Sequence, residues 1–125
     1  IIDSIKKVCS KEKINGGHFQ GIGACGKAIL STYLPAVDEF KEHEFTGMLE
    51  MVSLIGNVTI NSDKNISIHA HASFSYLSEQ DEVKVVGGHL RAAYISYTGE
   101  IILRPAKIDL TQRLDIVPKV AVWNL

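Results

Sequence analysis

The sequence is poor in cysteine and contains no long apolar run. Cys9 and Cys25 are too few and too far apart for a disulfide framework or for a zinc site made of thiolates. No stretch approaches the roughly 18 apolar residues that a membrane-spanning helix needs. These absences exclude a disulfide-stapled domain and a helical membrane protein. We expect a globular protein of a reducing cytoplasm, with both cysteines packed as small apolar residues.

An excess of positive charge is also missing. Lys and Arg total 13 against 14 Asp and Glu, which gives a formal net charge of −1. Proteins that bind duplex DNA on their own usually carry a basic stripe. The nearest approach to one is a group of four lysines, Lys6, Lys7, Lys11 and Lys13. Glu12 interrupts this group, so we interpret it as the solvated face of a helix.

The 125 residues suit a single domain of the α/β class with an α+β layout. One helix is expected within residues 1–14, where Ile5 and Val8 fall on the apolar side and an Asn-Gly-Gly run follows. The remainder favours strands, and residues 49–60 are expected to form a central strand with a bulge at Gly56. The other expected strands cover residues 18–22, 27–33, 39–46, 66–76, 83–86 and 89–104, the last as one strand or two.

Residues 21–26 match the G-x-G-x-x-G pattern of dinucleotide-binding loops. That motif binds pyrophosphate only where it joins a buried parallel strand to the N-terminus of a helix. Here the next residues are strand-like and reach Pro35 too soon for a crossover helix. We therefore reject a nucleotide site and explain the glycines by a bulge or a close approach of backbones. A nucleophilic pair of Cys25 and His18 lacks an orienting carboxylate, so Cys25 is interpreted as packing.

Histidines form the most informative pattern of the chain. Residues 66–76 alternate strictly between apolar and polar, which predicts a strand with one buried face. His69 and His71 share the polar face and lie about 6.5 Å apart at Cα. At that spacing, two ring nitrogens can meet a single metal ion at about 2.0–2.1 Å.

A third histidine, His89, follows Gly87 and Gly88 at the end of the next expected strand. The two glycines would let the backbone bring His89 close to the pair. Three neutral imidazoles without a fourth strong ligand are the pattern of an open metal site. Such ligands suit zinc, nickel, copper or iron, and zinc is favoured by its frequency. A polar strand face whose histidines bond only serine and water is the alternative.

Four motifs follow one another in a familiar order: GIGA at 21–24, LEMVSLIGN at 49–57, HAH at 69–71 and GGHL at 87–90. Together they resemble the PPC domain, the "plants and prokaryotes conserved" family, from the first helix to residues 113–115. The resemblance implies a compact domain with a single antiparallel-rich mixed β-sheet and one main N-terminal helix, assembled as a homotrimer. It also implies a metal site at His69, His71 and His89.

The chain departs from the family pattern in three ways. Plant members carry an Arg-Phe pair where this chain has Met48 and Leu49. The AT-hook, a minor-groove reader joined to the plant domains, is not found here, so DNA binding of the plant type lacks its main agent. The family's opening strand does not precede the helix, which we interpret as a segment lying ahead of Ile1.

Two functional hypotheses from different classes follow. In the first, the chain is a metal-bearing trimeric module like the family's DNA-binding and regulatory members, with protein or nucleoprotein partners and only weak direct contact with DNA. In the second, it is a small metal-dependent enzyme, in which Glu50 or Glu100 orients a histidine or acts as general base toward metal-bound water. The alternative for either glutamate, which we favour, is an exposed strand position or a salt bridge. Apolar residues on both sides of residues 49–60 favour a surface between subunits.

Overall fold

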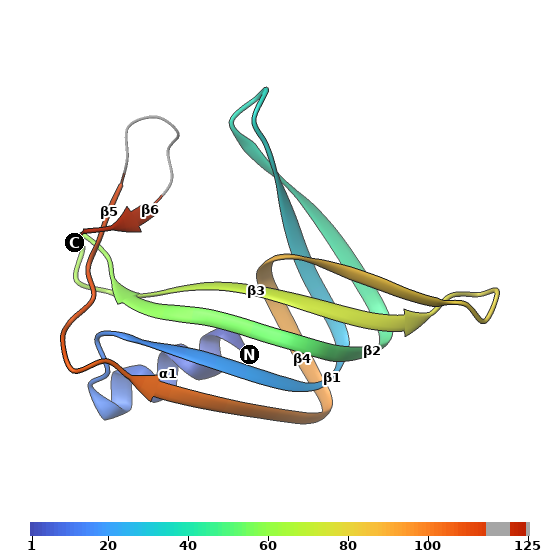
Figure 1. The fold of residues 1–125 in the computed structure, drawn as a ribbon, viewed down its shortest axis with the longest axis horizontal. Helices are drawn as coiled ribbons and strands as arrows, with labels where there is room; N and C mark the ends of the chain where they lie inside the picture. Colours follow the sequence, from blue (N-terminus) through green and yellow to red (C-terminus); the bar gives the residue numbers. More distant parts are fainter. Residues whose placement is uncertain (115–120, 125) are drawn as a thin grey trace.

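A computed structural model describes residues 1–114 and 121–124 (Figure 1). After one N-terminal helix, the described chain is mostly β-structure. The elements in chain order are α1 (Ile2–Glu12), β1 (Gly17–Leu34), β2 (Glu39–Ile60), β3 (Ile66–Leu77), β4 (Val83–Pro105), β5 (Gln112–Leu114) and β6 (Ala121–Trp123). Strands expected as separate pieces are thus continuous in β1, β2 and β4. The final residue of the motif at 113–115 lies outside the described residues.

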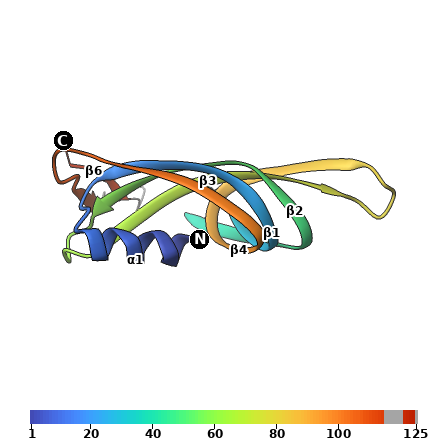
Figure 2. The same ribbon diagram turned by 90° about the horizontal axis from the view of Figure 1, so that it is seen from below.

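Strands β1 to β4 form an antiparallel sheet that closes on itself. β1 pairs with β2 along one edge and with β4 along the other, and β3 lies between β2 and β4. Figure 2 shows α1 against one side of this sheet and the β3–β4 hairpin extending beyond it. The predicted antiparallel-rich sheet with its N-terminal helix is confirmed. The sheet also closes into a barrel, which the strand pattern of the sequence does not predict.

α1 packs on the sheet through a narrow apolar stripe. Ile5 and Cys9 stand one turn apart and are both buried, as the helical spacing predicts. Val8, expected on the same side, is instead 48% exposed. The partly buried Ile2 packs against the same core, so the stripe that meets the strands follows Ile2, Ile5 and Cys9. The helix ends at Glu12, and Lys13 caps it in the left-handed conformation with a φ of 56°.

The glycines at 21–26 lie inside β1, where the strand is irregular. Its register shifts between Gly21 and Gly23 against β2, and again between Cys25 and Lys27. A Cβ on Gly23 would lie 2.3 Å from the carbonyl oxygen of Thr98 on β4, a distance that no side chain tolerates. A strand on both sides of these glycines leaves no place for a nucleotide-binding helix. The prediction of bulges and close backbone approach is confirmed.

The predicted bulge at Gly56 is wrong. Gly56 stands in regular register opposite Phe19 on β1 and Ala70 on β3, and the shift in the β2–β3 pairing falls between Met51 and Ser53. Glycine is needed at this position for a different reason: a Cβ would lie 2.2 Å from Cζ of the Phe19 ring. The ring of Phe19 therefore occupies the space in which a side chain at position 56 would lie.

The core lies between α1 and the inner side of the sheet. Cys9 and Cys25 are fully buried in it, and burial raises the pKa of both thiols, so each acts as a small apolar residue as predicted. The largest side chains of this core are Phe19, Phe74, Leu49, Met51, Leu54 and Val58. No helix among the described residues has the length and hydropathy needed to span a bilayer.

Candidate metal centre

The alternating pattern of β3 turns two histidines away from the core. Ala70 and Ala72 are buried, whereas His69 and His71 are exposed on the opposite face. Because side chains alternate along a strand, burial of the two alanines fixes the side to which both imidazoles project. The predicted strand and the shared face of the pair are both present.

His89 joins the pair through strand pairing between β3 and β4. It stands directly opposite His71 and is half-buried. The two preceding glycines lie at tight contacts: a Cβ on Gly87 would approach the carbonyl oxygen of Ala72 to 3.2 Å, and one on Gly88 that of Ser31 to 3.2 Å. Small residues at 87 and 88 thus let β4 run close to both neighbouring strands just before His89.

The three rings are close enough to serve one ion. Their centroids lie 5.3 Å apart for His69 and His71, 5.0 Å for His69 and His89, and 5.5 Å for His71 and His89. One nitrogen from each lies within 4.8 Å of the other two. Bonds of about 2.1 Å in a tetrahedral site place ligand nitrogens about 3.4 Å apart, so small rotations of the side chains complete the geometry. The donor set of three imidazoles fits a borderline transition metal.

The surroundings of the site favour the neutral form of His69 and His89. Burial is the main cause that lowers the pKa of His89 to about 4, and the nearby charges of His69, His71 and Arg91 contribute to this lowering in that order. Burial, followed by the charge of His71, also lowers the pKa of His69. A protonated imidazole cannot bind a metal, so these shifts prepare both residues for binding at neutral pH.

The structure does not bring Glu50 and Glu100 to the histidines of the same chain. Glu50 stands opposite Ser75 on β3, at the other end of the β2–β3 pairing from His69. Glu100 stands opposite Ile22 on β1. Both carboxylates line a separate open cavity on the outside of the sheet. Among the described residues, the group that could hold a metal ion contains histidines alone.

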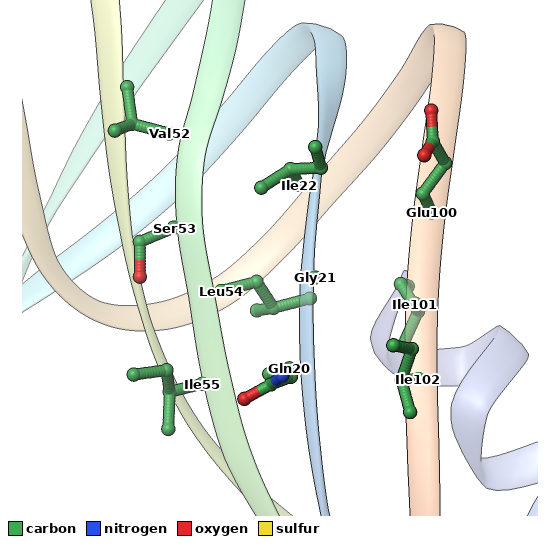
Figure 3. Close-up of a pocket in the computed structure, with 10 residues that line it drawn as sticks. All are labelled: Gln20, Gly21, Ile22, Val52, Ser53, Leu54, Ile55, Glu100, Ile101 and Ile102. Carbon is green, nitrogen blue, oxygen red and sulfur yellow. The ribbon is translucent and has the colours of Figure 1, made fainter.

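An apolar groove lies beside these carboxylates (Figure 3). Its volume is about 600 Å³, and it spans β1, β2 and β4. Four of its apolar side chains are more than half exposed, namely Ile22, Val52, Ile55 and Ile102. In Figure 3, Ile22 and Leu54 project into the space between the strands. We call the four exposed residues Ile22, Val52, Ile55 and Ile102 the outer apolar surface.

The lysines near the N-terminus are exposed, as predicted. Lys11 lies 3.8 Å from Glu12 in a surface ion pair. Lys6 and Lys13 line a polar cavity of about 570 Å³ that Lys64, from the turn between β2 and β3, also lines. The sequence did not indicate this third lysine, because the turn is distant from the helix along the chain.

Two residues near His89 were also not evident in the sequence. Ser31 on β1 stands directly opposite His89, and Glu42 on β2 stands directly opposite Ser31. Arg91 donates a hydrogen bond from Nε to Oε1 of Glu42, at 3.3 Å. No local motif marks these positions, because they meet only through the pairing of three strands.

Solved structures share this fold. A plant- and prokaryote-conserved (PPC) protein from Pyrococcus horikoshii is 29% identical, with a TM-score of 0.83 over 98% of this chain and 82% of that protein. A metal-containing protein from Archaeoglobus fulgidus is 24% identical, with a TM-score of 0.87 over 100% and 85% of the two chains. A candidate DNA-binding protein from Bacteroides thetaiotaomicron is 19% identical, with a TM-score of 0.88 over 98% and 82%.

No curated protein matches the sequence significantly. The model of the Plants and Prokaryotes Conserved (PCC) domain, however, matches residues 1–107. This match spans α1 and all four strands of the closed sheet, and it includes the three histidines. The chain therefore belongs to the Plants and Prokaryotes Conserved domain family, which its four sequence motifs resemble.

Proposed function

We propose that this protein is a metal-binding module that assembles as a homotrimer and associates with partner proteins or nucleoprotein complexes in the cytoplasm. The observation that carries the metal site is the approach of one nitrogen from each of His69, His71 and His89 to within 4.8 Å of the others. The name of the metal-containing relative from Archaeoglobus fulgidus is consistent with it.

A divalent transition metal, with zinc favoured, would be held by the three imidazoles. When bound, such an ion acts as a Lewis acid with a coordination position open to water or to a donor atom of a partner. His69 and His71 are exposed, so the open position would face solvent. The half-buried His89 anchors the site to the sheet.

Assembly into a trimer is supported by the outer apolar surface. A contiguous set of exposed aliphatic side chains on a strand face favours contact with another protein surface. The apolar character of β2 on both faces, with Met51 and Leu54 buried and Val52 and Ile55 exposed, agrees with that expectation. The number of three subunits comes from the family resemblance.

Direct binding to duplex DNA is proposed to be weak. Candidate DNA-binding proteins occur among the structural relatives. This chain, however, has a net charge of −1, and assembly into a trimer multiplies that charge without changing its sign. Association with nucleic acid would therefore depend on a partner.

A metal-dependent enzyme is the second candidate, and the open coordination position favours it. General-base catalysis needs a carboxylate or another base within reach of the bound water. Glu50 and Glu100 lie in another cavity of the same chain, so an active site would need a group from a neighbouring subunit or from the substrate. The binding module is better supported for this reason.

Metal analysis of purified variants tests the proposal. The wild-type protein should hold one equivalent of metal per chain, and His71→Ala should abolish stoichiometric binding. His43→Ala is the matched control, because His43 stands opposite the buried Leu30 and is not part of the cluster. Full retention of metal in a His69→Ala, His71→Ala double variant would refute the site.

A further inference from the structure

One buried hydroxyl next to the histidine site has no hydrogen-bond partner. Ser31 is only 2% exposed, and its Oγ makes no hydrogen bond to any described residue. Buried polar groups in folded proteins are nearly always hydrogen-bonded, so each exception calls for an explanation. A serine hydroxyl can donate one hydrogen bond and accept two, and here all of these capacities are unused.

Strand pairing places this hydroxyl beside His89. Ser31 stands directly opposite His89 in the β1–β4 pairing, and His89 stands directly opposite His71 in the β3–β4 pairing. Side chains directly opposite each other share one face of the sheet, with Cβ atoms about 4.5–5.5 Å apart. Ser31 and the three histidines therefore lie on the same face, with His89 between Ser31 and His71.

An ion pair lies across β1 at the level of Ser31. Glu42 on β2 and Arg91 on β4 are joined at 3.3 Å, although β1 runs between their strands. This contact crosses β1 on the face that carries Ser31. The ring of Phe40 packs against that of His89, with the ring centroids 5.6 Å apart. Of the two residues directly opposite Ser31, Glu42 already accepts a hydrogen bond from Arg91, which leaves the imidazole of His89 as the polar neighbour of the Ser31 hydroxyl.

A metal-bound imidazole needs such a neighbour. When one ring nitrogen of a neutral histidine binds an ion, the other carries a proton, and this N–H donates a hydrogen bond to an acceptor. This acceptor fixes the tautomer and the orientation of the ring. His89 is half-buried, so solvent is a poorer acceptor for it than for the exposed His69 and His71.

We propose that Ser31 is the positioning residue of His89: its Oγ accepts the ring N–H of His89 when the other nitrogen binds the metal. The inference rests on the proposed metal site and adds a residue to it. It also assigns a partner to a buried hydroxyl that has none among the described residues. In this proposal the ring N–H of His89 becomes the hydrogen-bond partner of Ser31 when His89 binds the ion together with His69 and His71.

Zinc affinity of the full chain, measured by competition with a chromophoric chelator, tests this inference. Ser31→Ala should weaken zinc binding by tenfold to a hundredfold, the usual effect of removing the partner of a ligating histidine. Ser75→Ala is the matched control and should bind zinc like the wild type. Ser75 lies on the same face of β3 as His69 and His71, but it stands opposite Val85 and not opposite a histidine. The melting temperature without metal should be equal or higher in Ser31→Ala, since the substitution removes an unsatisfied buried hydroxyl.

The possible outcomes are distinct. Unchanged zinc affinity in Ser31→Ala overturns the role of Ser31 and leaves the metal site intact. A lower melting temperature without metal, together with weaker zinc binding, overturns it as well, because it would indicate a structural role. A wild-type protein that binds no zinc, nickel, copper or iron refutes the proposed function itself.

Discussion

The ring of Phe19 on β1 packs directly over Gly56 on β2, and the two residues stand opposite each other in register. A Cβ at position 56 would lie 2.2 Å from Cζ of Phe19 and 2.8 Å from the backbone oxygen of His69. One contact therefore links the packing of the core to β3, the strand that carries His69 and His71.

Gly56→Ala should destabilise the protein by about 3 kcal/mol, at the upper end of the usual cost of overpacking a core. Urea unfolding followed by circular dichroism measures this change. Adding Phe19→Leu should recover part of the loss, because the two residues contact each other and their effects are not additive. A Gly56→Ala protein as stable as the wild type would contradict the packing described here.

The stability of the metal-free protein should fall in mild acid because of His89. Its pKa of about 4 in the folded protein lies below the value of about 6.5 for an unfolded chain. As the pH falls through this interval, the unfolded chain takes up a proton first, so the free energy of unfolding decreases. The contribution is fully present above about pH 6.5 and lost toward pH 4.

Thermal melts of metal-free protein at pH 7 and pH 5 check this prediction. The wild type should melt at a lower temperature at pH 5, and His89→Asn should reduce the difference. His43→Asn, outside the cluster, should keep it. An equal difference in the wild type and in His89→Asn would show that His89 is not responsible.

A substitution on the outer apolar surface should disrupt assembly. Ile102→Asp places a charge among exposed aliphatic side chains, where a subunit contact would have to bury it at a high free-energy cost. Light scattering should report a trimer for the wild type and a smaller species for the variant. Val37→Asp, in the exposed turn between β1 and β2, is the control and should remain a trimer. A wild-type monomer at micromolar concentration would contradict the assembly.

Random duplex DNA should bind weakly at physiological salt, with a dissociation constant no lower than about 10⁻⁶ M. Any residual binding should involve the cavity lined by Lys6, Lys13 and Lys64. Lys64→Ala should therefore make the slope of log K against log salt concentration shallower by about 0.9, the value for one phosphate contact. Fluorescence anisotropy over a series of salt concentrations measures both quantities. Tighter binding would show that the net charge of −1 is a poor guide to this surface.

Local patterns were sufficient to predict the histidine strand. The alternation in residues 66–76 depends on burial of one strand face, and burial also selects the residue types, so His69 and His71 could be placed together from the sequence. Their meeting with His89 followed from a short hairpin, since β3 and β4 are adjacent in the chain. The helix was predictable for the same reason, because its buried stripe is periodic.

Relationships between distant segments were not predictable in this way. Closure of the sheet depends on the pairing of β1 with β4, and no local signal encodes it. The same pairing brings Ser31 to His89, whereas the β2–β3 register places Glu50 opposite Ser75 and away from the histidines. Gly56 was misassigned because a glycine in a strand is compatible either with a bulge or with a large side chain packed against it, and only the position of Phe19 decides.

His89 stands at a fork in the sheet, which is the point where the pairing of β4 changes from β3 to β1. Its pairing with His71 is the last in the β3–β4 pairing, and its pairing with Ser31 is the last in the β1–β4 pairing. An ion shared by His71 and His89 would therefore tie the base of the β3–β4 hairpin at the fork. Opening that begins at the hairpin tip could not pass this point without releasing the ion. Metal binding should thus slow amide hydrogen exchange beyond the fork more than in the exposed hairpin itself.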